Sequence, residues 1–173
     1  MEIPEAILSR KSVRAYAEKG LTDEEISTLI EAAIKAPSAG NMQPWAFVAV
    51  RDRGVKEALV EAAHGQGFVA SAPVIIVVCA EPARTAPKYG DRGTNLYCLQ
   101  DTAAAVENIL LTAAHNRLAT CWVGAFDEAM AAEALSLPEG IHPVAMIPVG
   151  YPDQEPRPRP RRPVAEVLHM DHW

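Results

Sequence analysis

Two short stretches of the chain combine residue types that can bind a phosphorylated, heteroatom-rich ligand. The first is Arg10-Lys11-Ser12-Val13-Arg14, in which three cations and a hydroxyl lie within five residues. A phosphate needs charge and several donors that converge from one side. In an extended segment alternate residues share a face, so Arg10, Ser12 and Arg14 can point the same way. A solvated basic turn has the same composition, so these residues alone leave both interpretations open.

The second stretch is the loop at 37–44, Pro-Ser-Ala-Gly-Asn-Met-Gln-Pro, between an amphipathic helix and an apolar strand. Pro37 ends the helix because proline lacks an N–H and its ring clashes with the preceding turn. Asn41 and Gln43 each carry amide donors and a carbonyl acceptor, so the loop can line a flat polar ligand. An ordinary helix-to-strand connection would also fit. Trp45, which begins the strand, is predicted to be a core aromatic.

Two later stretches carry the remaining candidate residues. The segment 157–163, Arg-Pro-Arg-Pro-Arg-Arg-Pro, predicts a stiff, extended, cationic arm. Such an arm can serve as a proline-rich ligand for another domain, but the apolar Val164, Val167 and Leu168 favour an arm that packs down. Further upstream, Gly124 follows an apolar strand and permits close backbone approach of a ligand, although a plain strand-ending turn would look the same.

Capping residues and hydrophobic spacing predict the elements that position these stretches. Thr22-Asp23-Glu24-Glu25 is a capping box, which begins an amphipathic helix that continues to Ala36. Further helices are predicted at 4–8, around 55–62, over 95–115 and after Asp127. Apolar runs predict strands at 45–50, 74–79, 120–123 and 144–149, and the run at 74–79 is typical of a strand buried on both faces. This order predicts an α+β fold around a central sheet.

The helix predicted over 95–115 has apolar residues on two faces. One stripe contains Leu96, Leu99, Ala103, Val106, Leu110 and Ala113, and the other contains Ala104, Leu111 and Ala114. A helix with two apolar faces lies either in the centre of the fold or between two subunits.

Composition limits the classes of protein to which the chain can belong. A length of 173 residues suits one domain with a sizeable core, spanning residues 1–173. A net charge of −6 argues against a nucleic-acid partner. Cys79, Cys98 and Cys121 lie in apolar runs, which predicts buried thiols in a reducing compartment, the cytoplasm. We expect no metal site, because Cys and His show no ligand spacing, and no membrane association, because no long apolar run occurs.

Together and in this order, the four stretches resemble the FMN-dependent nitroreductase family in its short, single-domain form. The resemblance runs from Ile7 to Trp173. It implies a mostly antiparallel sheet flanked by helices and an intertwined homodimer. It also implies that the C-terminal arm, residues 153–173, packs on the partner subunit.

The resemblance also implies roles for individual residues around FMN. Arg10 and Ser12, with Lys11 beside them, would hold the ribityl phosphate, and Arg14 would lie beside flavin N1 and the C2 oxygen. The flavin pocket would include Pro37, Ser38, Ala39 and Asn41, with some contacts from the other subunit, and Gln43 is a further candidate. The strand end Val123-Gly124-Ala125 would direct an amide at N5 or O4, and Arg159 and Arg161 would close on the phosphate.

The function implied is an NAD(P)H-dependent oxidoreductase. Hydride would pass from NAD(P)H through flavin N5 to nitroaromatic, quinone or similar small-molecule acceptors in a ping-pong cycle. No side chain needs to act as general acid or base, and Arg14 would give electrostatic support. Two alternatives stay open: a specialised relative of the same fold (a flavin-destroying, dehalogenating or thiazoline/thioether-oxidising enzyme), or a non-enzymatic FMN-binding module.

The chain departs from the family pattern in two places. Relatives usually have Gly-Leu-Gly where this chain has Arg117-Leu118-Ala119, and the first glycine ends the long helix in the left-handed conformation. We expect Asn116 to take that role here. The region 64–67, His-Gly-Gln-Gly, lacks the Asn and Lys of larger relatives. It fits a G-x-G-x-x-A pattern through Ala70, but it follows a helix rather than a strand, so no Rossmann site is expected.

Overall fold

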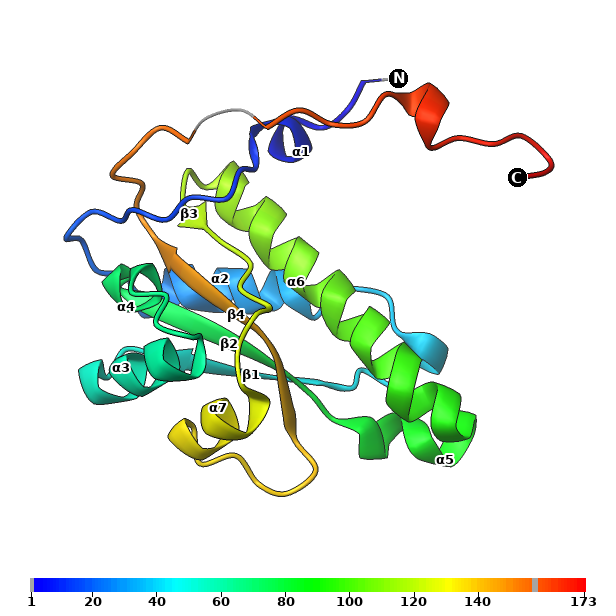
Figure 1. Ribbon diagram of the computed structural model, residues 1–173, viewed down its shortest axis with the longest axis horizontal. Helices are drawn as coiled ribbons and strands as arrows, with labels where there is room; N and C mark the ends of the chain where they lie inside the picture. The colour runs from blue at the N-terminus through cyan, green and yellow to red at the C-terminus, as the bar shows by residue number, and fades with distance from the viewer. Residues whose placement is uncertain (1, 157–158) are drawn as a thin grey trace.

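The computed structural model describes residues 2–156 and 159–173 and consists of a four-stranded sheet with helices on both faces (Figure 1). The strands pair antiparallel in the order β1-β2-β4-β3. The elements are α1 Glu5–Ser9, α2 Asp23–Ala33, η1 Ala39–Asn41, β1 Trp45–Val50, α3 Arg53–Ala62, α4 Phe68–Ser71, β2 Val74–Ala80, α5 Pro82–Arg92, η2 Gly93–Tyr97, α6 Cys98–His115, β3 Ala119–Thr120, α7 Glu128–Ala134, β4 His142–Gly150 and η3 Val164–Glu166.

These elements confirm the predicted α+β fold with an antiparallel central sheet. Strand β2 lies in the middle of the sheet and is buried along its whole length, as its apolar run predicts. Its even-numbered residues from Val74 to Val78 pack with α2 and α6, whereas the odd-numbered residues from Ile75 to Cys79 pack with α3, α4 and α7. Two helical layers therefore enclose the sheet, because side chains alternate between its faces.

The capping box at the start of α2 is confirmed. The Thr22 hydroxyl accepts a hydrogen bond from the Glu25 N–H at 3.1 Å, and the Glu25 carboxylate accepts one from the Thr22 N–H at 2.7 Å. The helix ends at Ala33, three residues earlier than predicted, and turn residues connect it to Pro37. Proline disfavours the helical conformation at the residue before it, so the helix ends ahead of Pro37 and not at the ring itself.

The strand predicted at 120–123 is shorter than expected. β3 contains only Ala119 and Thr120, and Val123 makes a single bridge to Met146. Trp122, between them, is 41% exposed, so this apolar run is not a continuous buried strand. Apolar composition alone therefore overestimates the length of the β3 pairing.

The long helix begins at Cys98 and is preceded without a break by the π-helical turn η2, whereas one regular helix from residue 95 was predicted. Half of its first apolar stripe is buried, namely Val106, Leu110 and Ala113, whereas Leu99 is 47% exposed and the other two residues are half-buried. The second stripe, Ala104, Leu111 and Ala114, is half-buried. One face of α6 thus packs on the sheet, and part of its apolar surface stays on the outside of the single chain.

The end of α6 differs from the prediction. Asn116 has φ −87°, and Arg117 takes the left-handed conformation with φ 59°. The Leu118 N–H donates to the Ala113 carbonyl at 2.8 Å and the Arg117 N–H to the Ala114 carbonyl at 3.1 Å. These two bonds form a Schellman motif, whose geometry requires the left-handed residue at position 117 rather than 116. Arginine therefore occupies a position that glycine adopts with less strain.

Replacement of Arg117 by glycine is expected to stabilise the fold. The left-handed conformation costs a non-glycine residue roughly 1–2 kcal/mol, and part of this gain is offset by the greater freedom of glycine in the unfolded chain. We expect the free energy of unfolding to rise by about 0.5–1 kcal/mol, measured by urea denaturation. The matched variant Asn116→Gly should show no gain, because Asn116 is not left-handed. A loss of stability in Arg117→Gly would contradict the strain argument.

Candidate functional site

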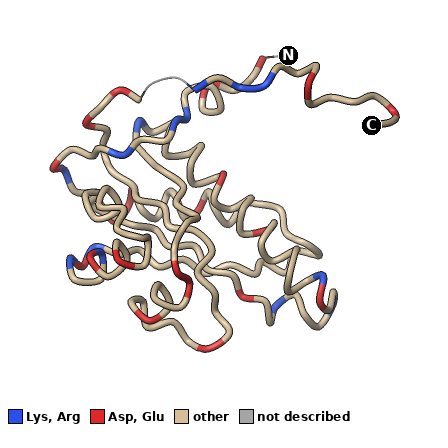
Figure 2. Tube along the Cα trace, in the orientation of Figure 1, with Lys and Arg blue, Asp and Glu red and all other residues tan. Residues whose placement is uncertain are grey.

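The N-terminal basic stretch and the C-terminal arm line one pocket of about 590 Å³, here called the basic pocket. Six of the sequence-predicted residues border it: Arg10, Lys11, Ser12, Arg14, Arg159 and Arg161. Gln154, Glu155 and Pro156 complete the lining. Figure 2 shows the basic positions of the N-terminal segment and of the arm gathered at one end of the molecule. The fold thus joins two cationic segments that lie far apart in the sequence.

The N-terminal segment is fixed to the sheet by a buried anchor. Val13 is buried, and its N–H donates to the Thr120 carbonyl at 2.9 Å. The Tyr16 hydroxyl donates to the Val13 carbonyl at 2.9 Å, and burial raises the pKa of this phenol, so it remains a donor at neutral pH. Because Val13 points into the core, its neighbours Ser12 and Arg14 are exposed on the pocket side.

The charge of the basic pocket is strongly positive. Its lining has five cations and one carboxylate, that of Glu155. Among the described residues, the Arg10 side chain makes one distant ion pair, 4.0 Å from the Glu107 carboxylate, and Arg161 donates to the carbonyl of Arg159 at 3.1 Å. Arg162 is not among the lining residues and pairs with Glu166 at 3.3 Å. Several unneutralised donors around one space suit a phosphate or another multivalent anion. Arg157 and Pro158, which belong to the predicted arm, lie outside the described residues.

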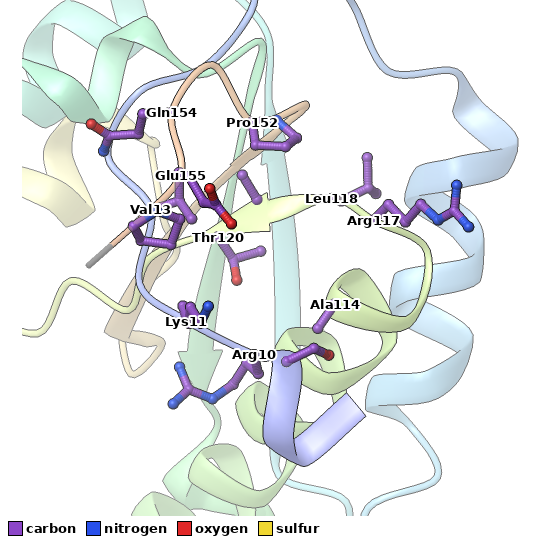
Figure 3. A pocket seen from close by; sticks show the side chains of 13 residues that line it. Arg10, Lys11, Val13, Ala114, Arg117, Leu118, Thr120, Pro152, Gln154 and Glu155 are labelled. Atoms are coloured by element: carbon purple, nitrogen blue, oxygen red, sulfur yellow. The ribbon is translucent and has the colours of Figure 1, made fainter. Parts of the chain in front are cut away.

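An apolar recess of about 430 Å³ adjoins the basic pocket (Figure 3). Arg10 and Lys11 border both spaces, while Val13, Ala114 and Leu118 supply apolar lining. In Figure 3 these side chains come from the N-terminal segment, from the C-terminal end of α6 and from the connection between α6 and β3. The cationic side chains that could bind a phosphate therefore lie beside a surface that can accommodate a less polar part of a ligand.

The 37–43 loop lies in a different part of the molecule from the basic pocket. Asn41 and Gln43 border a separate pocket of about 520 Å³ with Trp45, which is buried as predicted. Gly40, Asn41 and Gln43 all have positive φ, between 50° and 57°. The Ser38 hydroxyl accepts from the Gln43 N–H at 3.0 Å and holds this turn together. Pro37 is exposed, and Ser38 and Ala39 are half-buried.

The strand end at 123–125 is open to a ligand. Val123 is buried, whereas Gly124 and Ala125 are exposed. A Cβ atom added at Gly124 would approach nothing closer than the Trp122 ring at 3.7 Å. The Ala125 carbonyl accepts from the Gln66 side chain at 3.2 Å, which fixes the backbone at this point.

The basic pocket and the 37–43 loop lie toward opposite ends of α6. The loop contacts this helix at Asp101, and the recess beside the basic pocket contacts it at Ala114. At ~1.5 Å per residue, these two positions are about 20 Å apart along the helix. A single chain therefore does not unite the two groups of predicted residues in one site.

Metal chemistry and cysteine chemistry have no support in the described residues. Within 2–156 and 159–173, no group of three or more His, Cys, Asp or Glu side chains is arranged to hold a metal ion. Cys79, Cys98 and Cys121 are free and buried, and burial raises the pKa of Cys79 to about 11. Burial raises the pKa of the other two thiols as well, so all three are poor nucleophiles near neutral pH. No helix in the described part of the chain is both long and apolar enough to span a bilayer.

Three residues that shape these surfaces were not predicted from the sequence. Tyr16 fixes the N-terminal segment, Gln66 holds the strand end at Ala125, and Asp101 contacts the 37–43 loop. Only Asp101 carried a visible signal, since a carboxylate within an otherwise apolar helix needs a partner when buried.

Comparison with known proteins gives the class of this molecule. The fold is that of a group of oxidoreductases: the structure of the NADPH:FMN oxidoreductase of Vibrio harveyi in complex with NAD⁺ matches with a TM-score of 0.89 and 30% identity, over 98% of this chain and 76% of that one. An Archaeoglobus fulgidus protein whose name includes "NAD(P)H nitroreductase" is 38% identical over 153 residues, 86% of this chain and 84% of its own length. A Thermus thermophilus NADH dehydrogenase is 30% identical over 190 residues, 94% of this chain and 93% of its own.

The model of the Nitroreductase family matches residues 7–69 and 60–151. The chain belongs to the nitroreductase family and is an oxidoreductase enzyme. This finding confirms the family resemblance and the fold predicted from the sequence.

Proposed function

We propose that this enzyme is an FMN-dependent oxidoreductase that passes hydride from NAD(P)H to nitroaromatic, quinone or similar small-molecule acceptors. The observation that carries the proposal is the basic pocket, in which Arg10, Ser12, Arg159 and Arg161 converge. Relatives named NADPH-flavin oxidoreductase in Vibrio harveyi and FMN reductase in Bacillus subtilis support the choice of cofactor.

The residues present fit FMN. Four of the five cations in the lining, with the hydroxyl of Ser12, suit a phosphate monoester better than a neutral ligand, and the fifth, Arg14, is left to border the ring. The open backbone at Gly124 leaves room for a flat ring to approach an amide. When bound, the flavin would supply the hydride-accepting and hydride-donating centre, while the protein positions it and stabilises its charge.

In this proposal the phosphate is held by Arg10, Lys11, Ser12, Arg159 and Arg161, and the ring is bordered by Arg14 and by the strand end at Val123, Gly124 and Ala125. Pro37, Ser38, Ala39, Asn41 and Gln43 border the ring from the 37–43 loop of a second copy. Asn41 and Gln43 offer both donors and acceptors to the edge of the ring.

The proposed assembly is a homodimer in which residues 1–173 form one domain per copy. Two copies related by a two-fold axis, with their α6 helices antiparallel, would place the loop of one beside the basic pocket of the other. The arm supports this arrangement, because Val164, Val167, Leu168, Met170 and Trp173 are all between 54% and 102% exposed. Figure 1 shows the end of the arm, the red segment that contains η3, extending away from the sheet and its helices. The buried free thiols are in keeping with a cytoplasmic location, which we include in the proposal.

The test of the function is an absorption spectrum of the purified protein. We expect a yellow protein whose visible flavin bands bleach on addition of NADH or NADPH without oxygen and return with a quinone or nitroaromatic. Bound flavin that no nicotinamide nucleotide reduces would indicate a binding module or a specialised relative. A colourless protein that takes up no FMN would contradict the proposal altogether.

Arg14→Ala is expected to lower the midpoint potential of bound FMN. The Arg14 guanidinium lies 5.5 Å from the centre of the Phe68 ring, on the exposed side of the N-terminal segment. A fixed cation stabilises the negative charge that a flavin gains on reduction. Loss of about 1–3 kcal/mol corresponds to a decrease of about 20–60 mV for two electrons. Spectroelectrochemistry measures the shift, and Arg14→Lys, which keeps the charge, is the control. Equal potentials for Arg14→Ala and wild type would show that Arg14 lies elsewhere.

A further inference from the structure

We propose that Asp101 is a positioning residue that holds the 37–43 loop in the shape required to border the flavin. The inference rests on the proposed function and adds to it a residue that contacts neither phosphate nor ring. Asp101 belongs to the first turn of α6, and Ala39 belongs to η1 at the centre of the loop. The two residues are 62 positions apart in the sequence, so only the folded chain brings them together.

The contact is a hydrogen bond from a backbone amide to a carboxylate. The Ala39 N–H donates to both carboxylate oxygens of Asp101, each at a distance of 3.1 Å. This N–H lies at the start of the 3₁₀ turn, where the amide has no partner within the turn itself. Asp101 thus caps the turn from a neighbouring helix, in addition to the internal bond between Ser38 and Gln43.

The loop needs external support because its backbone is strained. Asn41 and Gln43 have φ of 57° and 50°, a region that non-glycine residues adopt at a cost. Without a fixed point at Ala39, the chain can relax to ordinary backbone angles and turn the two carboxamides away. A bond from α6, whose inner face packs against the sheet, gives the loop such a fixed point.

Asp101 is buried, and keeping its carboxylate there costs free energy of folding that the bond to Ala39 offsets only in part. The residue is 6% exposed, and burial raises the pKa of its carboxyl group. A raised pKa in the folded state means that the charged form lowers stability at neutral pH. Attraction to a helix terminus does not account for the residue, because η2 leads into α6 without a break.

Hydrogen exchange of the FMN-free protein tests the contact itself. Asp101→Ala should accelerate exchange in the peptide covering residues 38–43 by about tenfold, because the Ala39 amide loses its acceptor. Asp101→Asn keeps an acceptor oxygen and should stay within about threefold of wild type. Thr102→Val is the matched control. It removes a buried hydroxyl from the same turn of α6, one that bonds only to carbonyls of that helix, and should leave the loop unchanged.

Titration with FMN tests the role in the site. We expect the dissociation constant to rise about tenfold in Asp101→Ala, and to stay within about threefold of wild type in Asp101→Asn and Thr102→Val. The melting temperature of Asp101→Asn should not fall, since the variant no longer buries a charge. A global loss of stability would not weaken FMN binding in Asp101→Ala while leaving it nearly unchanged in Asp101→Asn and Thr102→Val. If Asp101→Ala does not fold, Asp101→Glu displaces the carboxylate by one methylene and should weaken FMN binding in the same way.

Each result decides the proposal. Unchanged loop exchange in Asp101→Ala, or equal acceleration in Thr102→Val, would overturn the contact. Faster exchange with unaltered FMN affinity would overturn the positioning role. A wild-type protein that binds no FMN would instead refute the proposed function, while the exchange experiment would still report on the contact.

Discussion

Replacement of both Arg10 and Arg161 by alanine is expected to abolish stable FMN binding. The two arginines come from opposite ends of the chain and line the same pocket. Each charge-assisted bond to a phosphate contributes roughly 1.5–3 kcal/mol, so the pair should weaken binding by at least a hundredfold. Fluorescence titration of the flavin measures the dissociation constant, and the single variants should lie between wild type and the double variant.

Arg162→Ala provides a matched control for this experiment. Arg162 is adjacent to Arg161 and has the same charge, but it pairs with Glu166 and does not line the basic pocket. Its removal should change FMN affinity by less than about threefold. If the double variant is purified with full flavin content, the phosphate is bound elsewhere and the assignment of the basic pocket is wrong.

Removal of residues 164–173 is expected to dissociate the enzyme into monomers with little FMN. This truncation keeps Arg159 and Arg161 but removes the exposed apolar residues of the arm, Val164, Val167, Leu168, Met170 and Trp173. Obligate dimers bury more than about 2,000 Å² in total, so an arm that lies on the partner would contribute a large part of the interface. Because each flavin would be bordered by both copies, loss of the dimer should also reduce flavin content.

Analytical ultracentrifugation at micromolar concentration gives the assembly state. Glu166→Gln is the control, since it alters the arm without removing apolar surface, and it should stay dimeric. A truncated protein that sediments as a dimer would show that the arm is not needed for assembly. A wild-type protein that is monomeric and fully loaded with flavin would contradict the proposed dimer.

Local signals in the sequence predicted most of the fold. The bounds of β1, Trp45–Val50, agree with the prediction, and the capping box at Thr22 has the expected bonds. Asp127 caps α7 through its carboxylate, again as expected. These features depend on neighbours within a few residues, so the sequence contains them directly.

Features that depend on distant packing were not predictable in the same way. The pairing of β3 ends after two residues although the apolar run continues to Val123, and Leu99 is exposed although its spacing is helical. The left-handed residue after α6 is Arg117, since the hydrogen bonds of Leu118 fix the position. No pattern of residue types in the sequence distinguishes the short β3, the exposed Leu99 or the left-handed Arg117 from what was predicted.

In the candidate site, too, some features could be predicted from the sequence and others depend on distant contacts. The family resemblance implied that Arg10, Ser12 and Arg161 share one phosphate site, and the three residues line one pocket, while their role in binding stays a prediction. The bond between Asp101 and Ala39 joins segments 62 residues apart, and no composition signal links them. Whether the 37–43 loop joins the site depends on a second copy, which a single sequence does not describe.

The separation of the basic pocket from the 37–43 loop along α6 has a genetic consequence. In the proposed dimer each copy gives its pocket to one active site and its loop to the other. A chain defective only at Arg10 and Arg161, combined with a chain defective only at Asn41, would form one site with both defects and one site with none. Two inactive alleles could therefore complement each other within the mixed dimer, and such a pair would restore up to half of the sites in that dimer.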